Sequence, residues 1–309
     1  MNQKKATLFA LCAVLLWSTV ASAFKLSLRF LRPDPLLFWS ALVSTVVLGI
    51  ALAAQRRLGT AFRATRREVL LSALQGLLNP FLYYVVLFRA YDRLPGQIAQ
   101  PLNYTWALAI ALLSVPMLKQ RIRPASFFAL LVSLFGVMVI STRGDLRSLR
   151  VEEPLGVGLA VGSSLIWALY WILNLRDRRA AAAKLFLGFC FGTAFTLLFC
   201  LATRAPLALP LPGALGAAYI GLFEMGLTFL LWLDALRLSR TTAAVSNLIF
   251  LSPFVSLFLL RAVVGEPLHA SSFLGLVAIV AGIILQQRAS GPEPKGKRGV
   301  APAPGRLPD

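Results

Sequence analysis

Charged residues are scarce in this sequence, and histidine is almost absent. Only 14% of the 309 residues are charged, and the acidic ones number 12. The one histidine, His269, and the three cysteines show neither metal-ligand spacing nor a disulfide framework, which excludes a His-based zinc or catalytic cluster. No phosphate-binding loop (GxxxxGK followed by Ser or Thr) occurs, so ATP does not drive this chain directly. We expect no catalytic residues, no metal and no cofactor.

Apolar residues dominate the composition instead. They form 58% of the chain, and the mean hydropathy is +0.76, whereas a soluble domain is about half apolar and a quarter charged. This composition is typical of a polytopic membrane protein. The formal net charge is +19, but the basic residues are spread over short loops and form no single basic face, so we expect no nucleic-acid partner.

Ten apolar segments are long enough to cross a bilayer, whose hydrocarbon core of about 30 Å takes roughly 20 helical residues. Of the 31 lysines and arginines, 21 lie on the side of the N-terminus, so the positive-inside rule predicts that both termini are cytoplasmic. The first external loop, with Lys25, Arg29 and Arg32, goes against this trend. The expected spans are residues 6–25, 34–54, 68–90, 95–117, 124–141, 154–175, 184–203, 213–235, 240–262 and 271–287.

The same membrane pattern occurs twice along the chain. The run around Trp17 returns around Trp167, the run from Gly76 returns from Gly221, and residues 120–136 return further on, at spacings of about 145 to 150 residues. Each copy holds five spans, and an odd number places the second copy upside down. Inverted repeats are typical of secondary transporters. The sequence therefore predicts an all-α integral membrane protein of ten transmembrane helices, built as two inverted five-helix repeats around a central cavity.

The repeats also predict the domain boundaries. We expect a first five-helix domain at residues 1–145, a second at 151–288, and a disordered basic cytoplasmic tail, rich in proline and glycine, at 289–309. The N-terminus resembles a secretory signal with an Ala-Ser-Ala cleavage site at 21–23. Its apolar run is longer than that of a signal, and cleavage would remove a repeated helix. We therefore expect an uncleaved first span.

Three runs carry a resemblance to a known family. They are QKKATLFALCAVLLWST from residue 3, LNYTWALAIALLSV from residue 102 and SPFVSLFLLRAVVGEPL from residue 252. On these runs the chain resembles, over residues 4–288, the EamA-type branch of the drug/metabolite transporter superfamily, and the first two look like those of bacterial aromatic amino acid exporters. Two departures are visible: Ala107 stands where that run usually has proline, and Gln120 where many relatives have glutamate. The resemblance implies ten helices around a central cavity and the transport, commonly export, of small metabolites.

Aromatic and amide side chains gather inside the expected spans. Trp17 and Trp167 lie near the membrane centre, away from the interfaces where tryptophan is enriched, so they either pack between helices or line a cavity. Four side chains from Trp167 to Asn174 share one helix face, which either binds a planar or zwitterionic solute or forms a packing seam. The pair Asn79-Pro80 should interrupt its helix, as happens at transporter sites. The predicted substrate-binding residues are Trp17, Asn79, Tyr83, Asn103, Tyr104, Trp106, Trp167, Tyr170, Trp171, Asn174 and Asn247.

Glu224 is the most informative single residue. It lies in the middle of the eighth span, at the repeat position of Asn79. A carboxyl group at the bilayer centre costs a few kcal/mol, so it should face the protein interior. Three roles are open: coupling to protons, binding of a substrate ammonium group, or a protonated carboxyl that hydrogen-bonds to a neighbouring helix. Glu266, by contrast, precedes Pro267 in a loop, and we interpret it as structural.

These patterns together predict a secondary transporter of the bacterial inner membrane. It should export small organic metabolites, with amino acids, aromatic ones included, as the leading class, by alternating access of two halves. The alternatives are a passive channel or facilitator and an integral membrane enzyme, which the lack of paired acids and histidines within the spans disfavours. The expected partners are a small-molecule substrate and membrane lipid, and the protein should be a monomer or a homodimer.

Overall fold

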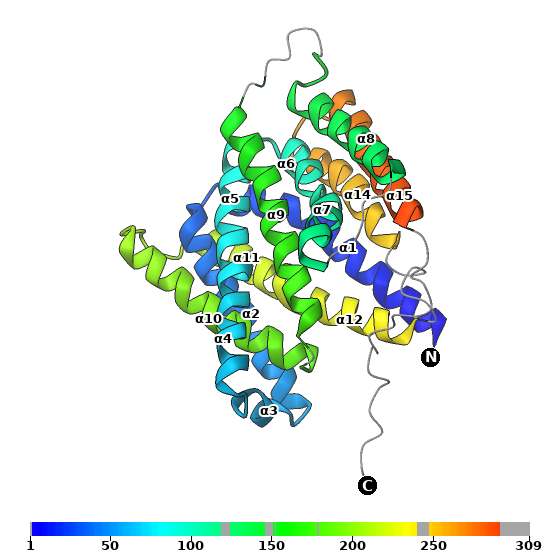
Figure 1. Ribbon diagram of the computed structural model, residues 1–309. Helices are drawn as coiled ribbons and strands as arrows, with labels where there is room; N and C mark the ends of the chain where they lie inside the picture. Colours follow the sequence, from blue (N-terminus) through cyan, green and yellow to red (C-terminus); the bar gives the residue numbers. More distant parts are fainter. Residues whose placement is uncertain are drawn as a thin grey trace.

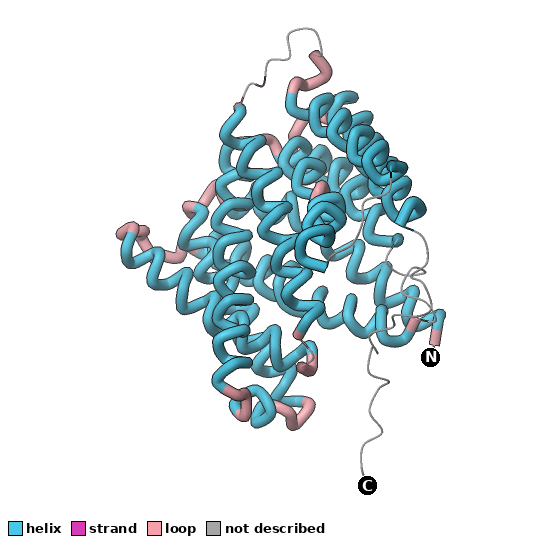
Figure 2. The backbone as a smooth tube through the Cα atoms, viewed as in Figure 1, coloured by secondary structure: helices cyan, strands magenta, loops and turns pink. Residues whose placement is uncertain are grey.

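The computed structural model describes residues 2–118, 124–145, 151, 153–177, 179–239 and 247–290. Within these ranges every regular element is a helix, and short loops join the helices (Figure 1 and Figure 2). Six helical segments are long and apolar enough to cross a membrane, judged by length and composition, and three more are shorter apolar helices. The fourth span consists of two short helices. The ten-span, all-α architecture is therefore confirmed.

The helices follow the expected spans closely. The first five spans are α1 (Gln3–Ser27), α2 (Pro33–Ala54), α4 (Arg66–Gly76) with η1 (Leu77–Leu82) and α5 (Tyr83–Arg93), α6 (Gly96–Asn103) with α7 (Trp106–Leu118), and α8 (Pro124–Ser141). The last five are α9 (Pro154–Arg176), α10 (Ala181–Ala202), α11 (Leu211–Tyr219) with η2 (Ile220–Leu227) and α12 (Thr228–Leu238), η3 (Asn247–Phe250) with α14 (Leu251–Leu259) and η4 (Leu260–Val264), and α15 (Ala270–Ser290). A short helix, α3 (Leu58–Phe62), lies between the second and third spans.

Local sequence signals account for several helix ends. The Asn2 side chain accepts a hydrogen bond of 3.1 Å from the backbone N–H of Lys5, which caps α1. Thr65 and Glu68 form a reciprocal capping box at the start of α4. Helix α1 runs without interruption past Ala21, which is fully buried. The predicted tail lies outside the described residues, apart from the last turn of α15.

The helix is irregular at matching positions of the third and eighth spans, one in each half of the chain. In the third span the irregular stretch is η1, where the backbone of Asn79 is extended (φ −144°, ψ 121°) and Pro80 has no N–H to donate. The interruption predicted at this pair is confirmed. In the eighth span the stretch is η2, which carries Glu224. Such irregular turns within helices often mark functional sites.

Close contacts between small residues hold α8 against α15. These helices form the most extensive pair among the described elements and lie side by side at one edge of the bundle (Figure 1). A Cβ atom on Gly136 would lie 2.5 Å from the carbonyl oxygen of Gly275, and one on Gly282 would lie 2.6 Å from that of Ala129. The backbones approach closely only because these side chains are small. These small residues therefore serve the close packing of α8 on α15.

Four spans meet in the middle of the bundle. Helix α1 packs along α12 and η2, α5 packs along α9, and α9 also contacts η1 (Figure 1). Large apolar side chains on the outer faces, such as Phe128 on α8 and Leu198 on α10, are 61% exposed, as expected for surfaces that face lipid. This arrangement brings the interruptions of the third and eighth spans to the helices that carry Trp17 and Trp167.

Candidate functional site

Glu224 has a carboxyl group enclosed by protein, although the residue as a whole is only half-buried. Its Oε1 atom accepts a hydrogen bond of 2.9 Å from the hydroxyl of Tyr84, a fully buried side chain of α5. Its Oε2 atom is buried and has no hydrogen-bond partner within the described ranges. No lysine or arginine there lies within ion-pair distance of this carboxyl. A carboxyl group with a free acceptor and no cation can bind one further donor.

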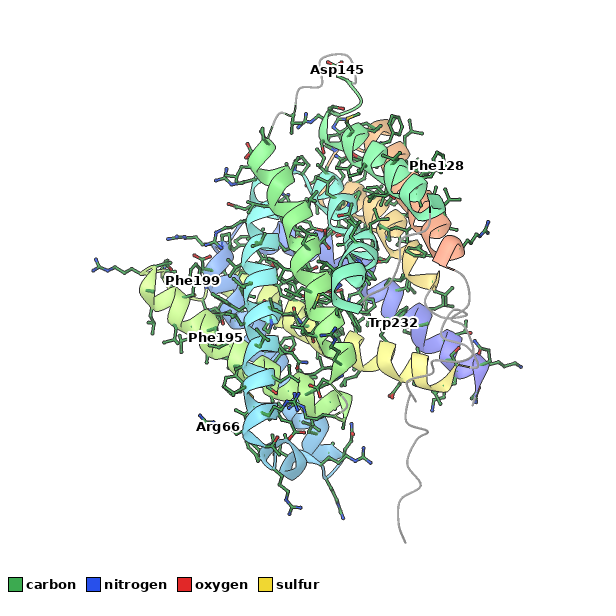
Figure 3. The ribbon with its side chains drawn as sticks, in the orientation of Figure 1. Arg66, Phe128, Asp145, Phe195, Phe199 and Trp232 are labelled. Carbon is green, nitrogen blue, oxygen red and sulfur yellow. The ribbon has the colours of Figure 1, made fainter. Side chains whose placement is uncertain are left out.

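Aromatic rings from four spans form a continuous cluster beside this carboxyl. Phe229 of α12 lies between the two central tryptophans, with ring centroids 5.8 Å from Trp17 and 5.9 Å from Trp167. Trp17 also contacts Trp232, which Figure 3 labels on α12. We call this set the aromatic cluster: Trp17, Tyr83, Tyr84, Trp167, Tyr170, Trp171, Phe229 and Trp232.

The cluster extends from α9 to the carboxyl of Glu224. The ring of Trp167 lies 4.6 Å from that of Tyr83, which lies 4.7 Å from that of Tyr84, the donor to Glu224. The face of α9 predicted from its spacing is also present, because Trp167 contacts the ring of Tyr170 at 5.6 Å. Offset and edge-to-face contacts of this kind are the arrangements that aromatic rings prefer.

Polar groups from three spans line the same region. The Tyr83 hydroxyl donates to Asn103 Oδ1 at 3.2 Å, and Asn103 Nδ2 donates to Ser163 Oγ at 2.8 Å. Asn103 ends α6 at the break within the fourth span, where the helix cannot satisfy all its backbone groups. At the far end of the α9 face, Asn174 Nδ2 donates to the Tyr170 hydroxyl at 3.2 Å. The structure therefore brings together most of the predicted polar residues.

Asn79 and Trp171 contribute buried polar atoms without partners. Neither polar atom of the Asn79 amide forms a hydrogen bond of normal geometry with a described residue, although the amide lies close to the Tyr170 hydroxyl. The indole N–H of Trp171 also lacks a partner among them. Buried polar groups are rarely left unpaired, and each such group needs an explanation. With Glu224, they make three unsatisfied groups around one aromatic cluster.

Three predicted residues stand apart from the cluster. Tyr104 is buried at the break between α6 and α7, and its hydroxyl lies close to the side chain of Ser252 in α14. Trp106 begins α7, packs half-buried on the apolar core and makes no ring contact with the cluster in the described structure. The backbone of Asn247 begins η3, and its side chain lies outside the described part of the chain.

Sequence reasoning missed Phe229 and placed Tyr84 outside the predicted set. Phe229 is an ordinary apolar residue of an apolar span, so no local signal distinguishes it. Ser163 could have been found, because it precedes Trp167 by four residues and so extends the α9 face by one turn. No group of three His, Cys, Asp or Glu residues that could hold a metal ion occurs in the ranges described.

Comparison with protein families places both halves of the chain in one group. A model described as the EamA-like transporter family matches the chain twice, over residues 4–142 and 154–286. Each match contains five spans. Together the two matches cover nearly all of the membrane-crossing chain.

Individual relatives agree with this match. The chain is 28% identical to the aromatic amino acid exporter YddG of Ancylobacter novellus, over 75% of this chain and 79% of that protein. It is 26% identical to protein PecM of Dickeya dadantii, covering 91% and 92% of the two chains. It is also 26% identical to the uncharacterized inner membrane transporter YhbE of Escherichia coli, covering 81% and 78%. A protein of known crystal structure shares the fold, with a TM-score of 0.65 at 24% identity over 94% of this chain and 98% of its own.

Proposed function

Because the chain belongs to the EamA-like transporter family, we propose that it exports small organic metabolites from the bacterial cytoplasm, with amino acids, aromatic ones included, as the leading class. The solute would bind between the two halves at the aromatic cluster, and the halves would open to either side of the membrane in turn. We infer export rather than uptake because one relative, YddG, is named an aromatic amino acid exporter. With both termini cytoplasmic, α1 would run from the inner to the outer surface.

The observation that carries this proposal is the state of Glu224. Its buried Oε2 has no partner, and its Oε1 has a single neutral donor, the Tyr84 hydroxyl. A substrate ammonium group would supply both a donor and the missing positive charge, and charged hydrogen bonds are worth about 1.5–3 kcal/mol. An amino acid brings this group in every member of its class. The site therefore favours amines over neutral solutes.

The rest of the site supports a zwitterion with an aromatic side chain. The Asn79 amide and the Trp171 indole offer N–H donors for a carboxylate, and neither has a partner of normal geometry in the described structure. The rings of Tyr83 and Trp167 belong to the aromatic cluster that reaches Glu224 through Tyr84, and they would provide stacking surfaces. The site thus holds groups for each part of an aromatic amino acid.

Transport measurements test the proposal directly. Purified protein in liposomes loaded with unlabelled amino acid should accumulate the labelled form by exchange, with saturation and with competition between amino acids. A channel would give flux that rises linearly with concentration and no exchange. An integral membrane enzyme would convert the solute, which chromatography of the recovered label would reveal. Either result would replace the carrier proposed here.

The substitution Glu224→Gln keeps the size of the side chain and removes its charge. If Glu224 binds the ammonium group, KM for an amino acid should rise about 10- to 100-fold, equivalent to about 1.4–2.7 kcal/mol. The preference over the N-acetylated amino acid should fall with it. Glu153→Gln, at an exposed ion pair on the surface, is the matched control and should leave KM unchanged.

Proton coupling would give a different result in the same variant. Transport by the wild type would then depend on pH, and in Glu224→Gln this dependence would flatten while the preference over the N-acetylated compound remained. Full activity with an unchanged KM and an unchanged pH profile would leave Glu224 as a packing carboxyl. That outcome would contradict the proposed binding site.

A further inference from the structure

A basic cavity lies at the end of the bundle that holds the loop after α1. This is the loop whose basic residues go against the positive-inside rule. The cavity has a volume of about 460 Å³ and lies between this loop and the ends of α2 and α5. Four arginines and two aspartates give it an excess of positive charge. The polar residues that line it are Arg29, Arg32, Asp34, Arg89, Asp92 and Arg93.

Two of these arginines are already neutralised and two are not. Carboxylates lie 2.7 Å from Arg89 and 3.2 Å from Arg93, in two ion pairs. Arg29 and Arg32 form no ion pair in the part of the chain that the structure describes. Two unpaired guanidinium groups at one cavity are suited to a phosphate group, which arginine binds through two parallel N–H donors.

An apolar groove begins where the basic cavity ends. It has a volume of about 390 Å³ and lies between α1, α11 and the end of the ninth span, in the half of the membrane nearest the basic cavity. Phe30 lines both the groove and the cavity, so the two adjoin at this side chain. Ser22 lines the groove, and its buried hydroxyl has no hydrogen-bond partner among the described residues.

Arg29 lines the basic cavity and contacts the end of the ninth span, which borders the groove. Its Nη2 donates a hydrogen bond of 3.2 Å to the carbonyl oxygen of Val264, and the neighbouring Val263 lines the groove. The guanidinium group is therefore held beside the end of the ninth span and keeps further N–H donors for a ligand. A cation beside an apolar groove at the membrane boundary matches the charge and polarity of an anionic phospholipid.

We propose that the cavity and the groove together bind one anionic phospholipid. Arg29 and Arg32 bind its phosphate, and one acyl chain lies in the groove between α1 and α11. Because α1 belongs to the first half of the chain and α11 to the second, the bound lipid contacts both halves. This site is separate from the aromatic cluster and does not depend on what the protein transports.

Lipid titration of the purified, delipidated protein tests this site. Native mass spectrometry would count bound lipids as phosphatidylglycerol or phosphatidylcholine with the same acyl chains is added. The wild type should retain one phosphatidylglycerol more tightly than any phosphatidylcholine. Arg29→Gln with Arg32→Gln should weaken that binding about 25-fold, or about fivefold per arginine, equivalent to about 1 kcal/mol each. Arg204→Gln, an exposed arginine at the end of α10, is the matched control and should bind as the wild type does.

A groove variant separates a lipid from a free anion. Ala23→Phe fills the groove without touching the arginines, so it should release phosphatidylglycerol but leave any competition by soluble glycerol phosphate unchanged. Competition by millimolar glycerol phosphate as strong as that by the lipid would assign the cavity to a free phosphate and overturn the proposal. Equal retention of the two lipids by the wild type would overturn it as well, and this measurement needs no variant.

Discussion

Glu266 joins the two halves of the protein at one helix end. Its Oε1 accepts a hydrogen bond of 2.9 Å from the backbone N–H of Gly96, and its Oε2 accepts one of 3.2 Å from Gln97. These N–H groups begin α6, where no preceding turn can accept their bonds and the helix dipole favours negative charge. The Gln97 side chain strengthens the junction, because it donates to the carbonyl of Pro267 and accepts from the backbone N–H of His269 at 2.9 Å. The structural role predicted for Glu266 is confirmed by these contacts.

The substitution Glu266→Ala should therefore destabilise the protein markedly. Loss of a helix cap costs about 0.5–2 kcal/mol, and leaving a buried N–H group unsatisfied costs about 1–3 kcal/mol. Both Gly96 and Gln97 are buried, so water replaces the carboxylate poorly. We expect a loss of about 2–4 kcal/mol in the free energy of unfolding. Glu266→Gln keeps one acceptor and loses the charge, so it should lose about half as much.

Denaturant unfolding in detergent micelles, followed by tryptophan fluorescence, measures these changes. The matched control is Glu153→Gln, because Glu153 pairs with Arg93 on the exposed surface, with exposed fractions of 39% and 47%. Exposed ion pairs contribute about 0–1 kcal/mol. If Glu266→Ala unfolds at the same denaturant concentration as this control, the carboxylate does not hold the halves together and the reasoning is wrong.

Three further predictions follow from the fold and its charges. Reporter fusions after Arg67 should give a cytoplasmic signal and fusions after Gly144 an external one; a cytoplasmic signal at Gly144 would refute the expected orientation. Gly282→Leu should separate α8 from α15 and cost about 3 kcal/mol or more in unfolding experiments, whereas Gly158→Leu, with open space around its Cβ position, should be tolerated. Burial raises the pKa of Asp177, but hydrogen bonds from a neighbouring arginine outweigh it, and the folded-state pKa lies below the usual 3.8. The charged Asp177 carboxylate therefore stabilises the fold above the unfolded-state pKa of 3.8, and this stabilisation is lost as the pH falls through the lower folded-state pKa. Asp177→Asn has no carboxyl group to titrate, so its free energy of unfolding should fall less steeply in acid.

The sequence alone was sufficient for the membrane architecture. Span positions depend on the length of apolar runs against the thickness of the bilayer, which is a local property of the chain. The interruption at Asn79 was also predictable, because Pro80 cannot donate a backbone hydrogen bond wherever it lies. The face of α9 from Trp167 to Asn174 followed from helical periodicity in the same way. Each of these features is determined by neighbours in the sequence.

Only the tertiary structure decided which side chains meet. Tyr84 and Glu224 are 140 residues apart, and their hydrogen bond exists because α5 and η2 pack in one particular rotation. Phe229 became the contact between Trp17 and Trp167 for the same reason, although nothing in its own span distinguishes it. Glu266 was recognisable as structural, but its acceptor role depends on where α6 begins in the other half of the protein. Periodicity predicts the face that a residue shares with its own helix, whereas the partner across the interface depends on the packing of the whole bundle.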